Sequence, residues 1–316
     1  MRTDKRKVAL IGTGMVGMSY AYSMLNQNIC DELVLIDINK KRAEGEAMDL
    51  NHGLAFSASN MKIYAGEYKD TSDADIAVIC AGVAQKPGES RLNLLKRNAA
   101  VFKSIVDPVT ESGFNGIFLV ATNPVDIMTY VALKLSGYPR NKVIGSGTVL
   151  DTARLKYLLS RHLDVDSRSI HAFIIGEHGD SELAVWSAAN VSGIPLNHFC
   201  ELRGYFDHME SMDRIYQSVR DSAYEIIEKK GATYYGVAMA VCRIAESVIR
   251  NEHSIMPISV YLDGLYGLHD ICLSIPTVVG QEGAEKVLDI PLDLMEMGKL
   301  VYSAEELKKI IGELEL

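Results

Sequence analysis

The sequence predicts an α/β fold, in which a doubly wound parallel sheet is followed by a mixed α+β domain. Short apolar runs recur through the first half of the chain, and each stops at a glycine, an aspartate or an alanine. Amphipathic stretches long enough for helices lie between these runs. This alternation is typical of parallel strands that crossover helices bury on both faces.

Strands are expected in the first half at residues 8–11, 33–36, 76–80, 117–120 and 142–144. The amphipathic residues 89–111 are long enough to form a crossover helix. The alternation ends near Gly145. We therefore expect a first domain at residues 1–145 and a second domain at residues 146–316.

The second half is less regular and predicts long helices combined with a few strands. Helices are expected at residues 149–159, 215–230 and 235–250, and strands at residues 255–262 and 271–279. The chain ends in Ser303-Ala-Glu-Glu306 followed by apolar residues at helical spacing. This is a capping-box pattern, which predicts that a final helix begins at Ser303.

Composition excludes several classes of protein. The net charge is −9 and no basic face is clustered, which argues against nucleic-acid binding. No apolar run approaches the roughly 18 residues of a membrane helix, and the apolar patch near the N-terminus is too short for a secretory signal. Five scattered cysteines without metal-ligand spacing indicate reduced thiols and no metal site. A cytoplasmic protein is expected.

A glycine-rich turn follows the first expected strand. It reads Gly12-Thr-Gly14-Met-Val-Gly17, and Asp37 stands twenty residues later at the end of the second strand. Such a turn lets a pyrophosphate approach the backbone at a helix N-terminus, as in Rossmann-type domains. The Asp37 carboxylate would bind a ribose and repel a 2′-phosphate, so NAD is expected rather than NADP. Lys40-Lys-Arg42 would soften that preference if its charges reach the site.

One histidine lies in a glycine-flanked segment of the second half, Ile174-Ile-Gly-Glu-His-Gly-Asp-Ser181. Histidine titrates near neutral pH, so His178 suits the proton transfer that accompanies hydride transfer to a carbonyl. Asp151 and Arg154 lie on one helix face, where one side chain would orient His178 and the other would bind a substrate carboxylate. A locally bonded loop histidine and a surface ion pair remain the alternatives.

A second arginine follows the strand at residues 76–80. The segment Gln85-Lys-Pro-Gly-Glu-Ser-Arg91 contains a Pro-Gly turn, which predicts a loop at the carboxyl edge of the sheet. Ligands of open α/β sheets bind at that edge. Closure of such a loop would bring Arg91 to a substrate and exclude water.

Together these motifs resemble the lactate/malate dehydrogenase family. The matching segments, which extend from Gly12 to beyond Thr233, are GTGMVG, LIDINKKRAEGEAMDL, AGVAQKPGESRLNL, ATNPVD, SGTVLDTARLKYL, IIGEHGDSE and KGATYYGVA. The resemblance implies an NAD-dependent enzyme that reversibly reduces pyruvate to (S)-lactate in fermentation. It also implies a homotetramer.

The resemblance further implies a role for each matching residue. His178 would exchange the proton and Asp151 would orient it. Arg154 would bind the substrate carboxylate, and Arg91 would polarise the reacting carbonyl. Other positions that match substrate contacts are Gln85, Asn123, Thr233 and Val237.

Cofactor contacts are implied in the same way. The matching positions are Gly12, Gly14, Val16, Gly17, Asp37, Arg42, Tyr68, Gly82, Val83, Ser104, Ala121, Thr122, Asn123 and Ser146. For Tyr68 and Ser104 a role in packing alone is an equally good interpretation.

The residue expected to select the substrate is Gln85. In the malate branch of the family the matching position carries an arginine, which pairs with a second carboxylate. A neutral glutamine favours the methyl group of pyruvate, since an unpaired arginine in a closed site is costly. The alternatives are a malate or other 2-hydroxy-acid dehydrogenase, and a nucleotide sensor that has lost catalysis.

Many bacterial members of the family are activated by fructose 1,6-bisphosphate, through an arginine and a histidine at a subunit interface. His171 matches the histidine, and Lys156 stands where the arginine would be. Lysine keeps the charge and loses the planar fork that binds phosphate with two hydrogen bonds. Activation is therefore an open expectation for this chain.

Overall fold

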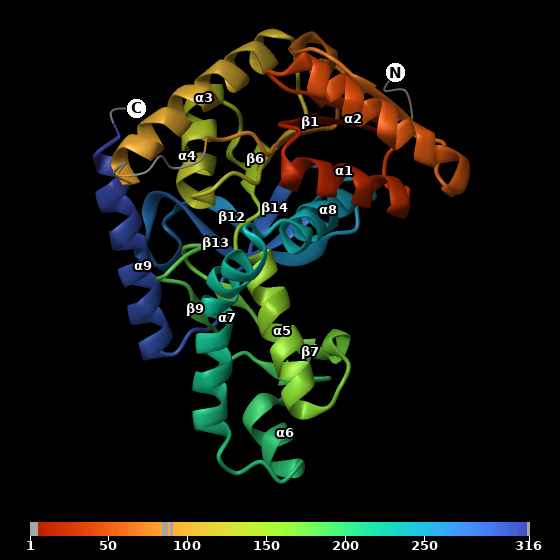
Figure 1. Ribbon diagram of the computed structural model, residues 1–316. Coiled ribbons are helices and arrows are strands. Elements are labelled where there is room, and N and C mark those ends of the chain that lie inside the picture. Colours follow the sequence, from red (N-terminus) through yellow and green to blue (C-terminus); the bar gives the residue numbers. More distant parts are fainter. Residues whose placement is uncertain (1–5, 84–87, 89–90, 315–316) are drawn as a thin grey trace.

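The computed structural model describes residues 6–83, 88 and 91–314, except for the side chains of Arg91 and His208. In this part of the chain the main sheet has nine strands in the order β14-β13-β12-β6-β5-β4-β1-β2-β3. Figure 1 shows α3 and α4 on one side of its parallel strands and α1 and α2 on the other. The expected doubly wound sheet followed by a mixed α/β region is confirmed.

The parallel part of the sheet comes from the first half of the chain. Its strands are β1 (Lys7–Ile11), β2 (Glu32–Ile36), β3 (Lys62–Ala65), β4 (Ile76–Ile79), β5 (Ile117–Val120) and β6 (Val143–Gly145). The helices are α1 (Met15–Gln27), α2 (Lys40–Gly53), α3 (Arg91–Glu111) and α4 (Val125–Ser136). The five predicted strands coincide with β1, β2, β4, β5 and β6, whose residues are all buried. The strand that the sequence missed, β3, lies at the edge of the sheet, where Lys62 is exposed.

The register aligns the ends of these strands. Ile11 at the end of β1 pairs with Ile36 of β2 and with Ile79 of β4. Ile79 in turn pairs with Val120 of β5, which pairs with Gly145 of β6. The loops that follow these strands therefore open together at the carboxyl edge, where ligands of such sheets bind.

The second half adds both helices and strands. Its helices are α5 (Val149–Leu163), α6 (Leu196–Leu202), α7 (His208–Lys230), α8 (Tyr235–Ile249) and α9 (Leu294–Gly312). Three strands join the main sheet: β12 (Ser254–Asp263), β13 (His269–Gly280) and β14 (Gly283–Val287). Five short strands lie outside it: β7 (Ile170–His171), β8 (Ile174–Ile175), β9 (Leu183–Ala184), β10 (Asn190–Val191) and β11 (Ile194–Pro195).

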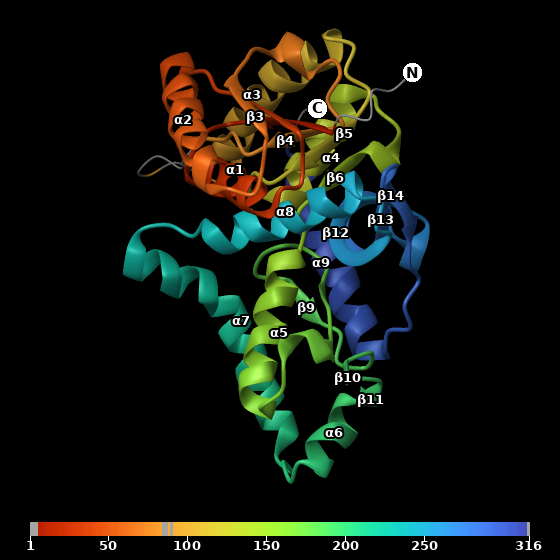
Figure 2. The same ribbon diagram turned by 90° about the vertical axis from the view of Figure 1, so that its right-hand side faces the viewer.

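The main sheet is continuous across the two halves. Ser259 of β12 pairs antiparallel with Gly145 of β6, so the late strands extend the parallel sheet. Figure 2 shows α8 running between α1 and α5, and it packs on both. The division into residues 1–145 and 146–316 stays a prediction, because strands from both sides of it share one sheet.

A separate apolar cluster holds α5 and α7 together. Leu155, Leu159 and Leu163 follow each other at helical spacing on α5, and they lie in one buried cluster with Met212 and Val219 of α7. The helix expected at residues 215–230 therefore begins earlier, at His208, because its first turns are also amphipathic and packed.

The expectation that the last helix begins at Ser303 is wrong. α9 begins at Leu294, where Asp293 accepts a hydrogen bond from the Glu296 backbone N–H and Glu296 accepts one from that of Asp293. Ser303 lies inside the helix, where its hydroxyl accepts a hydrogen bond from the Glu177 backbone N–H at 2.8 Å. A serine that looks like a cap in the sequence is therefore a tertiary contact.

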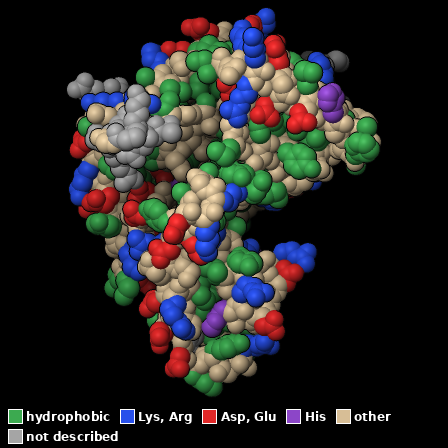
Figure 3. All heavy atoms as spheres, in the orientation of Figure 1, with side chains coloured by type: hydrophobic (Ala, Val, Ile, Leu, Met, Phe, Trp, Pro, Cys, Tyr) green, Lys and Arg blue, Asp and Glu red, His purple; other side chains and the backbone are tan. Residues whose placement is uncertain are grey.

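Charged side chains of both signs are mixed on the molecular surface (Figure 3). The face drawn in Figure 3 carries acidic and basic side chains interspersed, without a continuous basic area. Over the described ranges, no helix is both long enough and apolar enough to cross a membrane.

Candidate active site

The glycine-rich turn after β1 has the geometry of a nucleotide cradle. Gly12 adopts φ +103°, and a Cβ there would lie 2.6 Å from the Ala81 backbone nitrogen. A Cβ on Gly17 would collide with the Gly12 carbonyl oxygen. Gly14, by contrast, has open space around it. Gly12 and Gly17 thus close the turn tightly, whereas Gly14 leaves backbone free for a phosphate. This arrangement fits a dinucleotide.

Asp37 stands at the end of β2, facing this turn. Its carboxylate accepts hydrogen bonds from the Thr13 backbone N–H at 2.8 Å, the Thr13 hydroxyl at 2.9 Å and the Asn39 backbone N–H at 2.9 Å. Burial opposes ionisation, but these hydrogen bonds and the nearby Arg42 hold the pKa of Asp37 below its ordinary value. Asp37 is therefore anionic at neutral pH, as a ribose-binding carboxylate must be.

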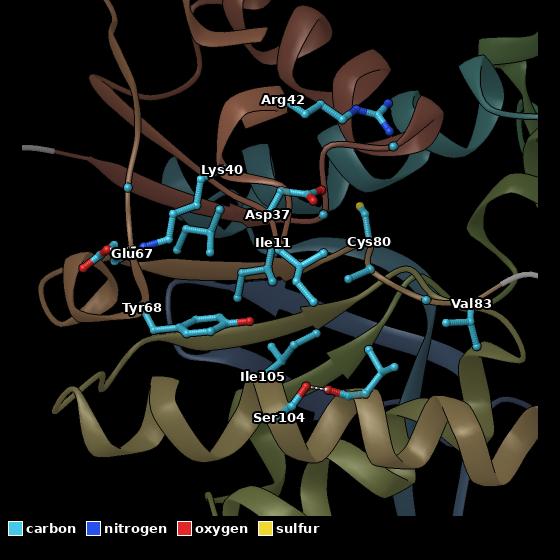
Figure 4. Close-up of a pocket in the computed structure, with 18 of the residues that line it drawn as sticks. Ile11, Asp37, Lys40, Arg42, Glu67, Tyr68, Cys80, Val83, Ser104 and Ile105 are labelled. Carbon is cyan, nitrogen blue, oxygen red and sulfur yellow. Dashed lines mark hydrogen bonds and ion pairs between the residues drawn. The ribbon is translucent and has the colours of Figure 1, made fainter. Parts of the chain in front are cut away.

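A cavity of about 860 Å³ opens between the turn, β2 and α3. Eight of the predicted cofactor residues line it: Gly12, Gly14, Asp37, Arg42, Tyr68, Gly82, Val83 and Ser104. Figure 4 shows the Tyr68 ring reaching into the cavity, with Ser104 on the α3 side. Burial and the charge of Asp37 raise the pKa of Tyr68, whereas the Ser104 hydroxyl donates to the Val101 carbonyl at 2.7 Å.

The other predicted cofactor residues lie beyond the lining of this cavity. Val16 and Gly17 belong to the first turn of α1, and Ser146 follows β6. Ala121, Thr122 and Asn123 follow β5, where the Thr122 hydroxyl donates to the Ala81 carbonyl at 2.8 Å and so links two strand ends.

Sequence reasoning did not single out Thr13, which contacts the Asp37 carboxylate twice. The signal was present, because a hydroxyl residue between two glycines of the turn is free to point toward the next strand.

The predicted acid/base group is assembled from two separate elements. The Nδ1 atom of His178 lies 2.6 Å from an Asp151 carboxylate oxygen, and the other oxygen accepts a hydrogen bond from Arg154 at 2.8 Å. Asp151 is buried in the first turn of α5, whereas the His178 side chain remains 23% exposed. The arrangement leaves Nε2 of the imidazole as the atom that can exchange a proton with a ligand.

The chain brings His178 to α5 through local contacts. Gly176 adopts φ +89°, so the backbone turns sharply after β8. The Thr152 hydroxyl of α5 accepts a hydrogen bond from the Ile174 backbone N–H at 2.9 Å, and the Thr148 hydroxyl donates to the Ile174 carbonyl at 2.6 Å. These bonds fix β8 against α5 just before the turn that carries His178.

Electrostatics favour the charged form of this pair. Burial alone would lower the pKa of His178, but Asp151 raises it by charge and hydrogen bonding, and Asp126 and Glu182 add to the effect, to give a pKa of about 9. Burial raises the pKa of Asp151, but His178 and Arg154 lower it by more. The net pKa of Asp151 therefore lies below its ordinary value. At neutral pH the pair is an imidazolium beside a carboxylate.

Asp126 is a residue of this region that the sequence analysis missed. It lies in the first turn of α4 and accepts hydrogen bonds from the His178 backbone N–H at 2.7 Å and the Ser259 hydroxyl at 2.6 Å. Burial raises the pKa of Asp126 to about 6 against those hydrogen bonds. A single acid among the apolar residues of 125–133 was the available signal. Through Asp126 the first turn of α4 is tied to the backbone of His178.

A metal is a weaker interpretation of this cluster. Ligand atoms of Asp151, His178 and Glu182 lie within 4.8 Å of one another, the one such group found among the described residues. Both oxygens of Asp151 are already committed to His178 and Arg154, and the guanidinium brings a positive charge to the place of a cation. The geometry therefore favours an ion-pair network over metal coordination.

The remaining predicted substrate residues are placed only in part. Gln85 lies outside the described residues, and Arg91 is described only as the first residue of α3. Asn123 is exposed at the end of β5, three residues before Asp126. Thr233 and Val237 flank the start of α8, which packs against α5. Among the described residues, no hydrogen bond or ion pair joins Asn123, Thr233 or Val237 to His178.

The two predicted effector residues do come together. Lys156 and His171 line one cavity of about 300 Å³ between α5, β7 and β12, and Arg243 of α8 lines it too. Burial lowers the pKa of Lys156. Arg243 is held there by Glu252 at 2.5 Å and by the Ser254 hydroxyl at 2.6 Å.

Comparisons with known proteins cover nearly the whole chain. Residues 6–145 match the NAD binding domain of lactate/malate dehydrogenases, and residues 148–315 match their alpha/beta C-terminal domain. The chain is 52% identical over 311 residues to L-lactate dehydrogenase of Acetivibrio thermocellus, covering 98% of both chains. It is 51% identical over 306 residues to that of Geobacillus thermodenitrificans, covering 97% of this chain and 96% of the relative.

Solved structures give the same result. A minor L-lactate dehydrogenase from Enterococcus mundtii, in its ligands-bound form, superposes with a TM-score of 0.96 at 43% identity, covering 99% of this chain and 100% of the other. A lactate dehydrogenase enzyme from a Medee basin deep-sea metagenome library superposes with a TM-score of 0.95 at 50% identity, covering 98% of both chains.

Proposed function

This chain belongs to the lactate/malate dehydrogenase family and has NAD-dependent L-lactate dehydrogenase activity, and we propose that His178 exchanges the proton of that reaction. The observation that carries the proposal is the 2.6 Å contact between His178 Nδ1 and Asp151. It commits Nδ1–H to the carboxylate and leaves Nε2–H for the substrate oxygen. In pyruvate reduction the imidazolium donates from Nε2, and in lactate oxidation the neutral imidazole accepts there.

Arg154 binds the substrate carboxylate in this proposal. Its guanidinium is partly exposed and already lies 2.8 Å from Asp151, so it is held with one edge free. A planar guanidinium can bind a carboxylate with two parallel hydrogen bonds, which would orient the 2-oxo carbon of pyruvate toward His178. Arg91 polarises the carbonyl, and Gln85, Asn123, Thr233 and Val237 complete the pocket.

The dinucleotide cavity holds NAD. When bound, NADH would supply the hydride for pyruvate reduction, and NAD⁺ would accept it in lactate oxidation. The residues proposed to hold it are those of the cradle and of the cavity described above, with Asp37 on the adenosine ribose. The fit rests on the tight turn at Gly12, the open space at Gly14 and the anionic Asp37.

The proton role is tested by removing the imidazole. We expect His178→Gln to keep NADH binding and to lose pyruvate reduction by about three orders of magnitude or more, since a positioned acid contributes typically 10²–10⁴-fold. NADH oxidation with a panel of 2-oxo acids, followed by absorbance, measures the loss and separates pyruvate from oxaloacetate as substrate. Retained turnover in the variant contradicts the role of His178.

The cavity of Lys156, His171 and Arg243 supports regulation by fructose 1,6-bisphosphate. Three basic side chains converge on about 300 Å³, which suits a phosphate group. In the test, pyruvate saturation is measured at neutral pH with and without the bisphosphate. We expect the sugar to lower KM in the native enzyme and to have little effect in Lys156→Gln. Lys309→Gln, an exposed lysine on α9, is the control. A saturation curve that the sugar does not move contradicts activation.

A homotetramer in the cytoplasm is the proposed state. Tyr22 of α1 and Tyr235 and Met239 of α8 are more than half exposed and line one apolar hollow. Exposed apolar patches of this kind mark contact surfaces between subunits. The five cysteines are free thiols, which fits a reducing compartment. Sedimentation equilibrium gives the mass, and a monomer at micromolar concentration contradicts the assembly.

A further inference from the structure

A third acid lies beside the His178–Asp151 pair. Glu182 stands just before β9, four residues after His178, and its side chain is buried at 6% exposure. Atoms of Glu182, Asp151 and His178 that could bind a cation lie within 4.8 Å of one another. The proton exchange proposed above does not use this carboxyl group.

The surroundings of Glu182 leave it without full hydrogen bonding. Its Oε1 atom is buried and has no hydrogen-bond partner among the described residues. On α7, the Tyr216 hydroxyl donates to the Glu182 backbone carbonyl, and Arg220 one turn later has a buried Nε that also lacks a partner there. The charged groups that act on Glu182 are thus Asp151 and Arg154 of α5, His178, and Arg220 of α7.

These neighbours favour a protonated Glu182. Two buried carboxylates at this separation cannot both ionise cheaply, and Asp151 is the one that Arg154 and His178 hold as an anion. Burial and the charge of Asp151 raise the pKa of Glu182 to about 8, against the opposing charges of His178, Arg154 and Arg220. At neutral pH the free enzyme therefore has Asp151 ionised and Glu182 protonated.

We propose that Glu182 is a further positioning residue of the pyruvate site, which acts through Asp151 and Arg154 and must stay protonated for pyruvate to bind. The inference rests on the proposed role of Arg154. A pyruvate carboxylate on that guanidinium adds a negative charge beside Asp151, and an ionised Glu182 would make a third. Since the bound substrate opposes ionisation of Glu182, binding and retention of the proton are linked.

A basic pH should therefore slow pyruvate reduction in two ways. Deprotonation of Glu182 weakens pyruvate binding, and deprotonation of His178 removes the proton donor. From values of about 8 and about 9, kcat/KM for pyruvate should fall about twentyfold between pH 7 and pH 9. With His178 alone the fall would be about twofold.

The test is the same pH series with Glu182→Gln, which keeps the shape of the side chain and cannot ionise. We expect kcat/KM of this variant to fall only about twofold from pH 7 to pH 9. The matched control is Glu296→Gln, a buried acid that caps α9 and binds Ser187 and should retain the native pH dependence. A Glu182→Gln profile parallel to the native one overturns the inference.

A measurement on the native enzyme decides the case if the variant does not fold. Oxamate, which carries the carboxylate of pyruvate on an amide, is added to the NADH complex in weak buffer at pH 8 with a pH indicator. We expect uptake of about 0.6 proton per site, whereas His178 alone accounts for about 0.1. Uptake near 0.1 overturns the inference.

A further variant separates this inference from the function on which it rests. Arg154→Lys should raise KM for pyruvate at pH 7 by at least about tenfold, because lysine lacks the planar fork. An unchanged KM in that variant contradicts the proposed role of Arg154. A raised KM together with a native-like Glu182→Gln profile contradicts the role of Glu182 alone.

Discussion

His178 and Asp151 lie 27 residues apart in the chain, and their side chains meet at 2.6 Å. One comes from the turn after β8 and the other from the first turn of α5, where a helix N-terminus favours a carboxylate. The contact fixes which imidazole nitrogen faces the ligand. Together with the charges of Asp126 and Glu182, and against burial, it also raises the pKa of His178 to about 9. One contact therefore contributes to both the orientation and the charge state of His178.

The two directions of the reaction should have opposed pH dependences. His178 must be protonated for pyruvate reduction and neutral for lactate oxidation. Because its pKa is raised to about 9, kcat/KM for pyruvate should fall, and kcat/KM for lactate should rise, as pH increases from 7 to 9. Initial rates in both directions across this range check the prediction. Parallel profiles would count against His178 as the proton-exchanging group.

Removing the charge of Asp151 should impair catalysis more than binding of the cofactor. In Asp151→Asn the pKa of His178 should fall and its preferred tautomer should be lost, lowering kcat/KM for pyruvate at pH 7 on the order of 10²-fold or more. NADH binding, followed by fluorescence, should change little. The control is Asp166→Asn, an exposed acid paired with Arg168. Equal activity in the two variants contradicts the role of Asp151.

The choice of NAD over NADP should depend on Asp37. Asp37→Ser removes the charge that repels a 2′-phosphate, while Arg42 remains in the cavity. We expect the ratio of kcat/KM for NADPH to that for NADH to rise on the order of tenfold or more. Glu67→Gln, an acid in the same cavity paired with Lys40, should change the ratio less. A ratio that stays constant in Asp37→Ser would refute the assignment.

The glycines of the turn should differ sharply in their tolerance of alanine. Gly12→Ala places a Cβ 2.6 Å from the Ala81 nitrogen at φ +103°, so we expect a loss of about 1–3 kcal/mol of stability and weak NADH binding. Gly14→Ala meets no atom within 4 Å and should keep the native Tm. Calorimetry compares the two, and similar Tm values would contradict the cradle geometry.

Substrate choice should depend on Gln85. By the resemblance to the malate branch, Gln85→Arg supplies an arginine that can pair with the second carboxylate of oxaloacetate, so the ratio of kcat/KM for oxaloacetate to that for pyruvate should rise on the order of 10²-fold. Gln217→Arg makes the same substitution on the exposed face of α7, beside Asp221, and serves as control. An unchanged ratio would show that another residue selects the substrate.

The errors of the sequence-based prediction have local causes. Ser303 resembled a helix cap because capping is read from four consecutive residues, whereas its hydroxyl in fact meets Glu177 across the fold. Strand β3 was missed because an edge strand needs fewer apolar residues than a central one. In both cases the deciding contact lies far away in the sequence.

Periodicity and glycine spacing are local properties of the chain, and they were enough to predict the parallel sheet, the cofactor turn and the histidine. The sequence also predicted Asp151 and Arg154 through their spacing on one helix. Which acids surround His178 follows from the way distant elements pack. Asp126 reaches the His178 backbone from α4, and Glu182 is buried beside Asp151 of α5. The pKa of a buried acid depends on neighbours that no local pattern specifies.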